Sequence, residues 1–542
     1  MPVARSDAAA CRFPHRSHLP GRGPDTADRA PGTCPSRVSG EREKNDQRGA
    51  QVVSSSSGEA DGADPRRWRA LAICLVGGFM VLLDVSIVNV ALPSIRSGLG
   101  AAQSELQWVL SGYALTFGLL LVPAGRVGDL QGRRTVFVSS LALFTLASAA
   151  CGAAPSATFL VIARLVQGLA GGALTPQISA LIQELFRGRE RGRAFGYYGT
   201  AIGVSTAVGP LLGGLLIAAF GDAEGWRAVF FVNVPIGLAA LPIAWRLLPA
   251  PAADRGDRRH DLDPVGVVLL GAAAVALLLP LVQEQEWKGD AKWLLVVVAV
   301  VLALGFVLWD RRYSRRGKEP LIDQRLFHRR SYSFGITMIT LYFAGFTPLF
   351  FVFTLFLQTG QRYSALLAGL AITPFAVGSA AAAAFGGRIV NRFGRPLVVV
   401  GLALVAAGFV GALIAVHASP TSGTGWVTAA PLLLGGFGSG LVISPNQTLT
   451  LSQVPVAEAG TAGGLLQTGQ RVGSAVGIAA VGSSFFGVVA SSRGDYAQAF
   501  DRGLLVALAF VGAALLIALT DVVVNRLADH DRGHRQAPGT AG

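Results

Sequence analysis

Fourteen apolar stretches, each long enough to cross a bilayer as a helix, constrain this chain of 542 residues more than any other feature. A helix needs about 20 apolar residues to cross a hydrocarbon core of about 30 Å. Only 14% of the residues are charged, whereas soluble domains contain about 25%. The sequence therefore predicts an all-α polytopic membrane protein. The predicted spans are residues 70–92, 107–124, 135–154, 158–183, 194–219, 226–248, 263–282, 291–310, 332–357, 365–386, 396–416, 426–447, 460–490 and 503–525.

Lysine and arginine are distributed unevenly over the connections between these spans. The loops after even-numbered spans contain roughly 22 of them, and the loops after odd-numbered spans contain roughly 7. Because positively charged loops stay in the cytoplasm, we expect a plasma-membrane protein with both termini in the cytoplasm. The same loops account for the net charge of +14, so no nucleic-acid partner is expected.

A charged, glycine-rich loop occurs twice in the chain. Residues 125–134 read GRVGDLQGRR and residues 387–395 read GRIVNRFGR. Two further matches lie at nearly the same offset: Gly168 and Gly172 with Gly436 and Gly440, and residues 205–209 with residues 473–477. Spans 1–6 therefore match spans 9–14, and spans 7 and 8 are an inserted hairpin. The two halves run parallel, since an even number of spans separates them.

This duplication predicts five parts. They are a disordered cytoplasmic tail (1–65), a six-helix bundle (66–250), an inserted transmembrane hairpin with flanking basic loops (251–330), a second six-helix bundle (331–526) and a cytoplasmic C-terminal tail (527–542). Membrane proteins built from repeated bundles usually hold their ligand between the bundles and work by rocking one against the other.

Two opposite charges are expected at similar depth in the membrane. Asp84 lies about 21 Å from the cytoplasmic end of span 1, and Arg164 lies about 9 Å below the outer end of span 4. In a core of about 30 Å these depths coincide, so the two side chains can form an ion pair if the two spans are neighbours. Such a pair could merely fix the packing. Because ionisable groups inside membranes are usually functional, we interpret Asp84 and Arg164 as a proton-coupling pair.

Other polar and aromatic residues within the spans are candidates for a substrate cavity. Four polar residues, 467, 470, 471 and 474, share one helical face of span 13 and either line a water-filled cavity or bond to neighbouring helices. Phenylalanines 343–353 of span 9 are either core residues or an aromatic wall for a flat lipophilic ligand. The cavity candidates are Asn89, Trp108, Tyr113, Gln177, Asn233, Gln358, Asn446, Gln467, Gln470 and Arg471.

The repeated loop and span 5 supply the remaining candidates. The acid and bases of the loop can pair with each other and with helix ends, which would make a cytoplasmic latch. The alternative is a positively charged loop that only sets the orientation of the protein in the membrane. That role requires no acidic residue, so it leaves Asp129 unexplained. Latch candidates are Gly125, Asp129, Gly132, Arg133 and Arg134 in the first copy and Asn391, Arg392 and Arg395 in the second. In span 5, glycines and a proline predict close helix contact and a bend; these residues are Gly209, Pro210, Gly213 and Gly214.

At these residues the chain resembles the major facilitator superfamily, specifically its fourteen-helix drug:proton antiporter branch of multidrug exporters. Residues 125–134 resemble the signature between helices 2 and 3, with Leu130 where an arginine is expected. Residues 164–168 resemble the helix 4 motif linked to proton transfer, and residues 209–214 resemble the helix 5 motif of antiporters. Residues 83–93 and 226–237 are similar to segments typical of the fourteen-helix branch.

The resemblance implies two six-helix bundles about a central cavity, alternating access, and export of lipophilic drugs or antibiotic-like compounds in exchange for protons. With Asn391 in place of Asp129, the second copy makes the latch asymmetric. The partners expected are a small lipophilic substrate, protons and membrane lipids, and a monomer is expected. No sequence motif indicates an enzyme, a cofactor or a metal site.

Two alternatives stay open at this point. One is a proton-coupled importer or metabolite facilitator on the same fold, which the antiporter-type motif at Gly209 and Pro210 disfavours. The other is a membrane sensor or scaffold that transports nothing. A scaffold would have little reason to bear the cost of inserting Asp84 and Arg164, about 2.5–3.5 kcal/mol each on insertion scales.

Overall fold

The computed structural model describes residues 66–221, 223–250, 263–282, 287, 289–418 and 423–536. The predicted N-terminal tail, residues 1–65, lies outside the described residues, as does the loop 251–262. The described residues form helices joined by turns and contain no strand.

Fourteen described helices are long and apolar enough to cross a membrane, and one corresponds to each predicted span. The first six spans are α2 (Arg66–Leu99), α3 (Gln103–Gln131), α4 (Arg133–Gly152), α5 (Ala157–Leu185), α6 (Gly188–Phe220) and the pair α7 (Gly225–Phe231) with α8 (Asn233–Leu247). The next two are α9 (Pro264–Val282) and α10 (Leu294–Arg315). The last six are α12 (Arg330–Leu355), α13 (Ala365–Phe393), α14 (Arg395–Ala418), α16 (Ala429–Thr450), α17 (Ala459–Ser491) and α18 (Tyr496–Gln536). Two short helices, α11 (Arg325–His328) and α15 (Thr424–Val427), lie in connections.

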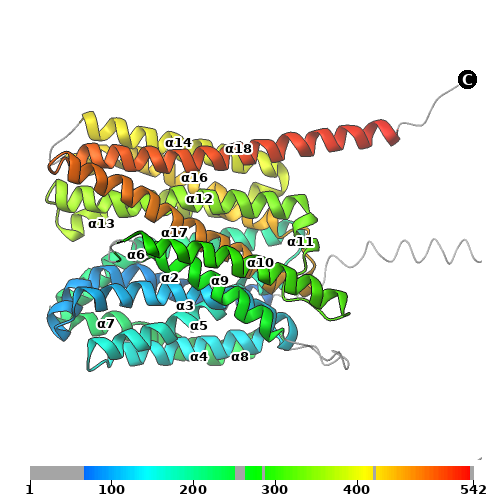
Figure 1. The fold of residues 1–542 in the computed structure, drawn as a ribbon, viewed down its shortest axis with the longest axis horizontal. Helices are drawn as coiled ribbons and strands as arrows, with labels where there is room; N and C mark the ends of the chain where they lie inside the picture. The colour runs from blue at the N-terminus through cyan, green and yellow to red at the C-terminus, as the bar shows by residue number, and fades with distance from the viewer. Residues whose placement is uncertain are drawn as a thin grey trace, which may run out of the picture. The chain divides into compact units, whose positions relative to one another are not determined.

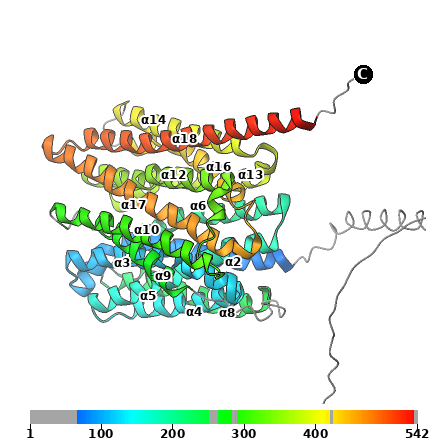
Figure 2. The same ribbon diagram turned by 45° about the vertical axis from the view of Figure 1, so that its right-hand side comes forward.

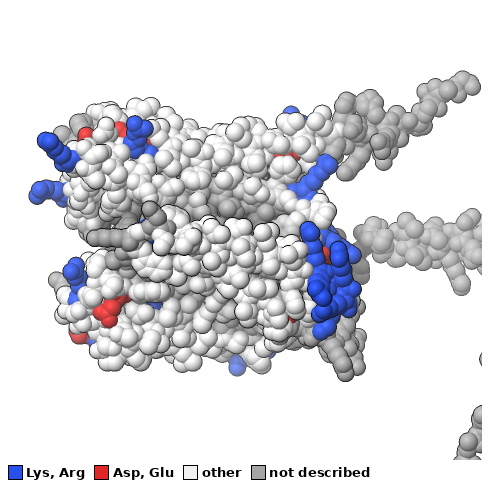
Figure 3. All heavy atoms as spheres, in the orientation of Figure 1, with Lys and Arg blue, Asp and Glu red and all other residues white. Residues whose placement is uncertain are grey.

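The helices lie side by side and alternate in direction (Figure 1). We call the end where α2 begins and α10 finishes the basic end, because lysine and arginine gather there on the face shown in Figure 3. Most helices extend beyond the predicted spans. α2 has 34 residues, or about 51 Å at 1.5 Å per residue. A run of apolar residues marks only the part of a helix that lies in the hydrocarbon core. The helical turns that continue into the headgroup region are polar, so the apolar run does not include them.

The sixth span is divided at Val232 into α7 and α8. Pro235 lies in the first turn of α8 and has no backbone N–H to donate to the carbonyl of Phe231, which explains the interruption. The break places Asn233 at the start of α8, where it is fully buried.

Glycines set the same close helix packing in both halves of the chain. A Cβ at Gly172 of α5 would lie 2.2 Å from the carbonyl oxygen of Phe117 on α3. A Cβ at Gly440 of α16 would lie 2.3 Å from the carbonyl oxygen of Ser379 on α13. The absence of a side chain therefore lets the backbone of α5 contact that of α3, and the backbone of α16 contact that of α13, at equivalent positions of the two repeats.

Helices α2 to α8 form one group and α12 to α18 form another, and both views of the ribbon show α3, α4, α5 and α8 on one side and α12, α14, α16 and α18 on the other (Figures 1 and 2). The groups meet where α3 packs on α17 and α6 packs on α13. Toward the basic end of this interface, Gln447 of α16 donates from Nε2 to Oγ of Ser179 of α5 at 3.1 Å. These residues are 268 positions apart, the same separation as Gly168 and Gly436, so equivalent positions of the two repeats face each other.

The inserted hairpin of α9 and α10 lies along one side of this interface. Leu278 and Leu281 of α9 cluster with Ala475 and Ala479 of α17 and with Leu115 of α3. α9 therefore packs against both groups at once. α10 is the outer helix of the hairpin, since only 11% of its most apolar stretch is buried.

Candidate functional site: a central cavity and a buried ion pair

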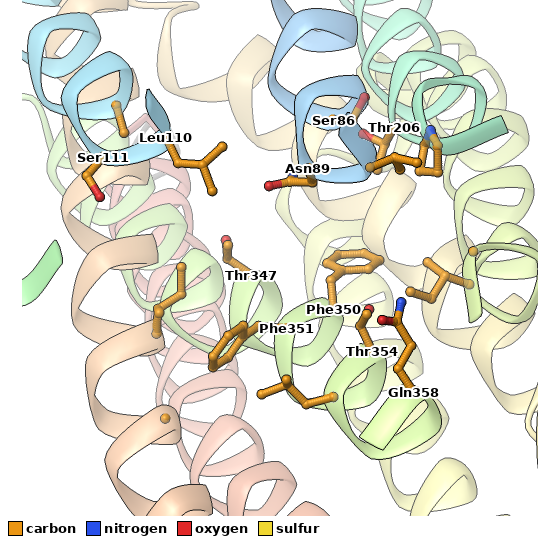
Figure 4. A pocket seen from close by; sticks show the side chains of 18 of the residues that line it. Ser86, Asn89, Leu110, Ser111, Thr206, Thr347, Phe350, Phe351, Thr354 and Gln358 are labelled. Carbon is orange, nitrogen blue, oxygen red and sulfur yellow. The ribbon is translucent and has the colours of Figure 1, made fainter. Parts of the chain in front are cut away.

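An open cavity of about 1210 Å³ lies between the two groups of helices (Figure 4). On α2, which starts at the basic end, the lining begins at Ser86; on α3, which starts at the opposite end, the lining finishes at Ala114. The cavity thus occupies the half of the bundle away from the basic end.

The cavity wall is apolar with neutral polar groups, and its described lining residues include no charged side chain. Phe350 and Phe351 of α12 project into the space (Figure 4). The polar lining residues are Ser86, Asn89, Gln107, Ser111, Thr206, Thr347, Thr354, Gln358, Thr373 and Ser483. Such a surface suits a large lipophilic molecule with a few hydrogen-bonding groups.

Asp84 and Arg164 form an ion pair in the interior of the first group. Arg164 Nη1 lies 2.6 Å from Asp84 Oδ2, and the side chains are 1% and 0% exposed. Arg164 also donates from Nε to the carbonyl of Val109, and its guanidinium lies 4.1 Å from the ring centroid of Tyr113. The pair lies at the depth where the cavity begins on α2, but on the other face of that helix. Ser86 and Asn89 line the cavity, whereas Asp84 shares a face with Val88 of the buried core.

The other oxygen of Asp84 accepts hydrogen bonds from two amides. Gln167 of α5 donates to Oδ1 at 2.8 Å, and Asn233 of α8 donates to the same atom at 3.4 Å. Both amides also donate to Oγ of Ser148 on α4. Every group bound to the carboxylate is a donor, so the arrangement fits the ionised form. These three donors leave one of the four lone-pair sites of the carboxylate for a proton, and protonation would remove the charge that strengthens all three bonds.

The basic end is closed by a carboxylate bound to a helix N-terminus. Asp129 of α3 accepts hydrogen bonds from the backbone N–H groups of Gly460 and Thr461, each at 2.9 Å, and from the Thr461 hydroxyl at 3.1 Å. These N–H groups belong to the first turn of α17 and have no partner within the helix. The positive end of the helix dipole further favours a carboxylate here. Gly125 contacts the same turn, since a Cβ on it would lie 2.3 Å from the carbonyl oxygen of Gly460.

Arg133 supports this contact from the start of α4. It bonds to Asp129 Oδ1 at 3.1 Å and to Glu184 Oε2 at 2.8 Å, and it donates to the carbonyl of Val456 across the interface. Gly132, which joins α3 to α4, has a φ of 106°, a conformation that favours glycine. Arg134 lies apart from the contact, with its guanidinium 4.3 Å from the ring centroid of Trp245.

The second copy of the loop is arranged differently. Asn391 of α13 faces Gly192 of α6, whose Cβ would lie 3.0 Å from Asn391 Nδ2. Gly192 is the fifth residue of α6, so its N–H is already bonded within the helix. Arg395 stays within its own group and pairs with Asp521 at 2.8 Å. Arg392 is exposed, 5.5 Å from the ring centroid of Phe393.

Two residues of the antiporter motif pack against α2 close to Asp84. A Cβ at Gly209 would lie 1.9 Å from Ser86 Oγ, and a Cβ at Gly213 would lie 3.0 Å from Ile87 Cγ1. Pro210 lines the cavity. Gly214 has open space where a side chain would be.

Of the cavity candidates, Asn89 and Gln358 line the cavity. The other eight lie outside its described lining. Several of these polar groups bind protein atoms instead: Asn233 binds Asp84, Gln177 donates to the Ala124 carbonyl, Asn446 binds Arg395 and the Gly335 carbonyl, and Gln467 donates to Ser179. Tyr113 is buried beneath Arg164, and Arg471 lies 4.4 Å from the ring centroid of Phe117. Trp108 and Gln470 are partly exposed but outside the lining.

Sequence reasoning missed the hydroxyl groups of the cavity and Ser148. Serine and threonine are common in membrane helices and usually bond to the preceding turn, so their presence alone gives no signal. The phenylalanines of span 9 divide into two sets. Phe350 and Phe351 line the cavity, whereas Phe353 packs on Phe500 in the core.

Comparisons with known proteins agree with this architecture. The sequence pattern described as Major Facilitator Superfamily matches residues 74–478. The chain belongs to the major facilitator superfamily. Its fourteen membrane-length helices agree with the fourteen-helix branch, and the family consists of transporters rather than enzymes.

Its relatives include proteins named as antibiotic transporters and resistance proteins. The chain is 37% identical to the probable actinorhodin transporter of Streptomyces coelicolor over 439 residues, which cover 80% of this chain and 75% of that protein. It is 34% identical to the puromycin resistance protein pur8 of Streptomyces alboniger, with 86% and 93% of the two chains covered. Among solved structures, the proton:xylose symporter XylE matches with a TM-score of 0.59 at 14% identity, covering 85% of this chain and 96% of that one. This last likeness concerns the fold alone.

Proposed function

We propose that this transporter exports lipophilic, drug-like compounds across the plasma membrane in exchange for protons. The observation that carries the proposal is the carboxylate of Asp84, which is fully buried at the depth where the cavity begins and is bound only by donors. Its relatives' names, which refer to an actinorhodin transporter and to puromycin resistance, support the substrate class. The proposal includes the division of the chain into five parts: two terminal tails, two six-helix bundles and an inserted transmembrane hairpin.

In the proposed cycle, a proton reaches Asp84 from the outside through the cavity. Protonation removes the charge that Arg164 pairs with, and the hydrogen bonds from the donors around the carboxyl group become weaker. α2, α5 and α8 then repack, and the transporter reorients. This arrangement favours proton coupling over a passive facilitator, because a facilitator gains nothing from a buried carboxylate that costs about 2.5–3.5 kcal/mol to insert.

The orientation follows from the charge of the basic end. Positively charged loops stay in the cytoplasm, so the basic end faces inward and both termini are cytoplasmic. The cavity then opens to the outside, and the bonds of Asp129 close the cytoplasmic side. We propose that these bonds act as the latch, which must break when the transporter reorients. The antiporter motif packs on α2 close to Asp84, so we propose that it follows the movement of that helix.

The Asp84→Asn variant tests the coupling. Asparagine keeps the size of the side chain but cannot take up and release a proton, so we expect proton-driven efflux to fall to the level of empty vesicles. The measurement is uptake of a fluorescent lipophilic dye into inverted vesicles, whose outer face is the cytoplasmic one, before and after the proton gradient is collapsed. Full gradient-dependent efflux by this variant would sink the proposal.

A matched control is Asp521→Asn, which removes a buried carboxylate at the basic end that pairs with Arg395 and lies away from the cavity. We expect it to retain gradient dependence at equal expression. If both variants lost efflux to the same extent, the effect of Asp84 would be one of stability rather than coupling.

A further inference from the structure

Arg471 is a cation at the centre of the bundle with no acidic partner among the described residues. It lies in the middle of α17, and none of the described salt bridges or hydrogen bonds involves its guanidinium. Its one described contact through the charged group is with the ring of Phe117 on α3, 4.4 Å from the centroid. The ionisable groups that face it are Tyr113 of α3 and Tyr198 of α6, both neutral.

The position of Arg471 is one helical turn beneath the cavity. Ala475, four residues further along α17, lines the cavity, as does Ala114, one turn from Phe117 on α3. Ser474 bonds to Thr347, another lining residue, at 2.7 Å. Arg471 is partly exposed, and its guanidinium lies on the buried ring of Phe117 of α3, so the side chain points into the bundle.

An unpaired arginine at this depth is costly, about 2.5–3.5 kcal/mol on insertion scales, and an aromatic ring offsets only part of that cost. The two fully buried arginines of the described residues have acidic partners, since Arg164 pairs with Asp84 and Arg133 with Asp129. The partly buried Arg395 also has one, Asp521. The described lining of the cavity above it contains no charged side chain. A ligand that supplied a negative group at the floor would therefore meet one unsatisfied cation and no repelling carboxylate.

We propose that Arg471 receives the anionic group of the transported compound, and that this exporter handles lipophilic weak acids, namely aromatic carboxylates or acidic phenols. This rests on the proposed function. The aromatic body would lie in the cavity against Phe350 and Phe351, and the carboxylate or phenolate would point to the floor. Arginine suits this role because its planar guanidinium binds a carboxylate through two parallel hydrogen bonds.

The floor is also connected physically to the coupling site. The guanidinium of Arg164 lies on the ring of Tyr113, Tyr113 stacks on Phe117 at 5.9 Å between centroids, and Arg471 lies on Phe117. A ligand that draws Arg471 away from Phe117 disturbs this stack, whose other end is the partner of Asp84. The substrate and the proton therefore act on one continuous column of side chains.

The test compares two probes that differ only in charge, 1-pyrenebutyrate and its neutral amide, on purified protein in vesicles of neutral phospholipid. Binding is read from energy transfer between the protein's tryptophans and pyrene. A charge-assisted contact of ordinary strength predicts that the wild type prefers the acid by about tenfold or more. Arg471→Gln should abolish this preference while retaining affinity for the amide, and Arg471→Lys should keep a preference for the acid.

The matched control is Arg493→Gln, which removes an exposed arginine beyond the far end of α17. It should bind both probes as the wild type does. A wild type without preference for the acid would overturn the inference, even if Arg471→Gln failed to fold. A preference that survives in folded Arg471→Gln would also overturn it.

Two further arms separate the remaining explanations. If anionic lipid headgroups occupy Arg471, adding phosphatidylglycerol to the vesicles should erase the preference of the wild type, and this result would overturn the assignment to a transported acid. A failure of the proposed function has a different signature, since neither probe would move in response to a proton gradient although the acid still bound. Conversely, proton-driven movement of the amide without any preference for the acid would overturn only the role of Arg471.

Discussion

Two carboxylates of this transporter, Asp84 and Asp129, have different surroundings, and the difference separates their roles. Asp84 is bound by side chains of α5 and α8, which belong to its own group of helices. Asp129 is bound by backbone N–H groups of α17, in the other group. Protonation of Asp84 therefore alters contacts within one group of helices first. The bonds of Asp129, in contrast, exist only while the two groups touch at the basic end.

The Asp129→Asn variant should loosen the start of α17. A neutral amide replaces charge-assisted bonds worth about 1.5–3 kcal/mol with weaker ones, so the N–H groups of Gly460 and Thr461 should exchange with deuterium about tenfold faster or more. Hydrogen exchange with mass spectrometry, on peptides that begin near Ala459, measures this directly.

The control is the equivalent residue of the second copy. Asn391→Ala should leave the exchange of Gly192 unchanged, because that N–H is bonded inside α6. Equal acceleration at both places would mean that the two copies contribute alike, and the asymmetry argued from Asp129 would be wrong.

At the scale of helices, the sequence predicted all fourteen spans, because length and hydropathy are read directly from apolar runs. It also predicted that Asp84 and Arg164 lie at one depth, and the ion pair is present. It could not predict which polar groups face the cavity. Gln177 and Gln358 look alike in sequence, yet one bonds to the Ala124 carbonyl at the closed end and the other lines the cavity. That choice depends on how helices are rotated against each other, which hydropathy does not encode.

The repeated glycines give a prediction at this scale. Alanine at Gly172 or at Gly440 should lower the stability of the protein, since the new Cβ would meet a backbone carbonyl that cannot move alone. Overpacking of this kind costs about 1–3 kcal/mol. The measurement is the melting temperature of purified protein in detergent, followed by tryptophan fluorescence.

Gly512→Ala provides the comparison, because nothing lies within 4 Å of its added Cβ. It should melt as the wild type does or slightly higher. An unchanged melting temperature in both Gly172→Ala and Gly440→Ala would show that α3 and α13 can shift to make room, and the matching helix contacts would not be rigid.

For the whole molecule, the structure predicts which residues a reagent outside the cell can reach. Gln358→Cys, in a background without the native cysteines, should react with a membrane-impermeant maleimide added to intact cells, since Gln358 is exposed at the mouth of the cavity. Ser179→Cys should stay unlabelled, because Ser179 is fully buried where the two groups meet at the closed end. Labelling of Gln358→Cys only after the cells are permeabilised would reverse the proposed orientation.

The contact between Ser179 and Gln447 has a consequence for how such a protein can evolve. In a dimer of identical subunits, two equivalent positions that face each other across the axis must be occupied by the same residue, so the interface has to be complementary to itself. Joining the repeats in one chain removes that constraint. A hydroxyl can then be matched with an amide, as here, and a carboxylate in one copy of the loop, Asp129, can correspond to an asparagine, Asn391, in the other. Duplication within a single gene thus allows the two sides of a gate to specialise independently.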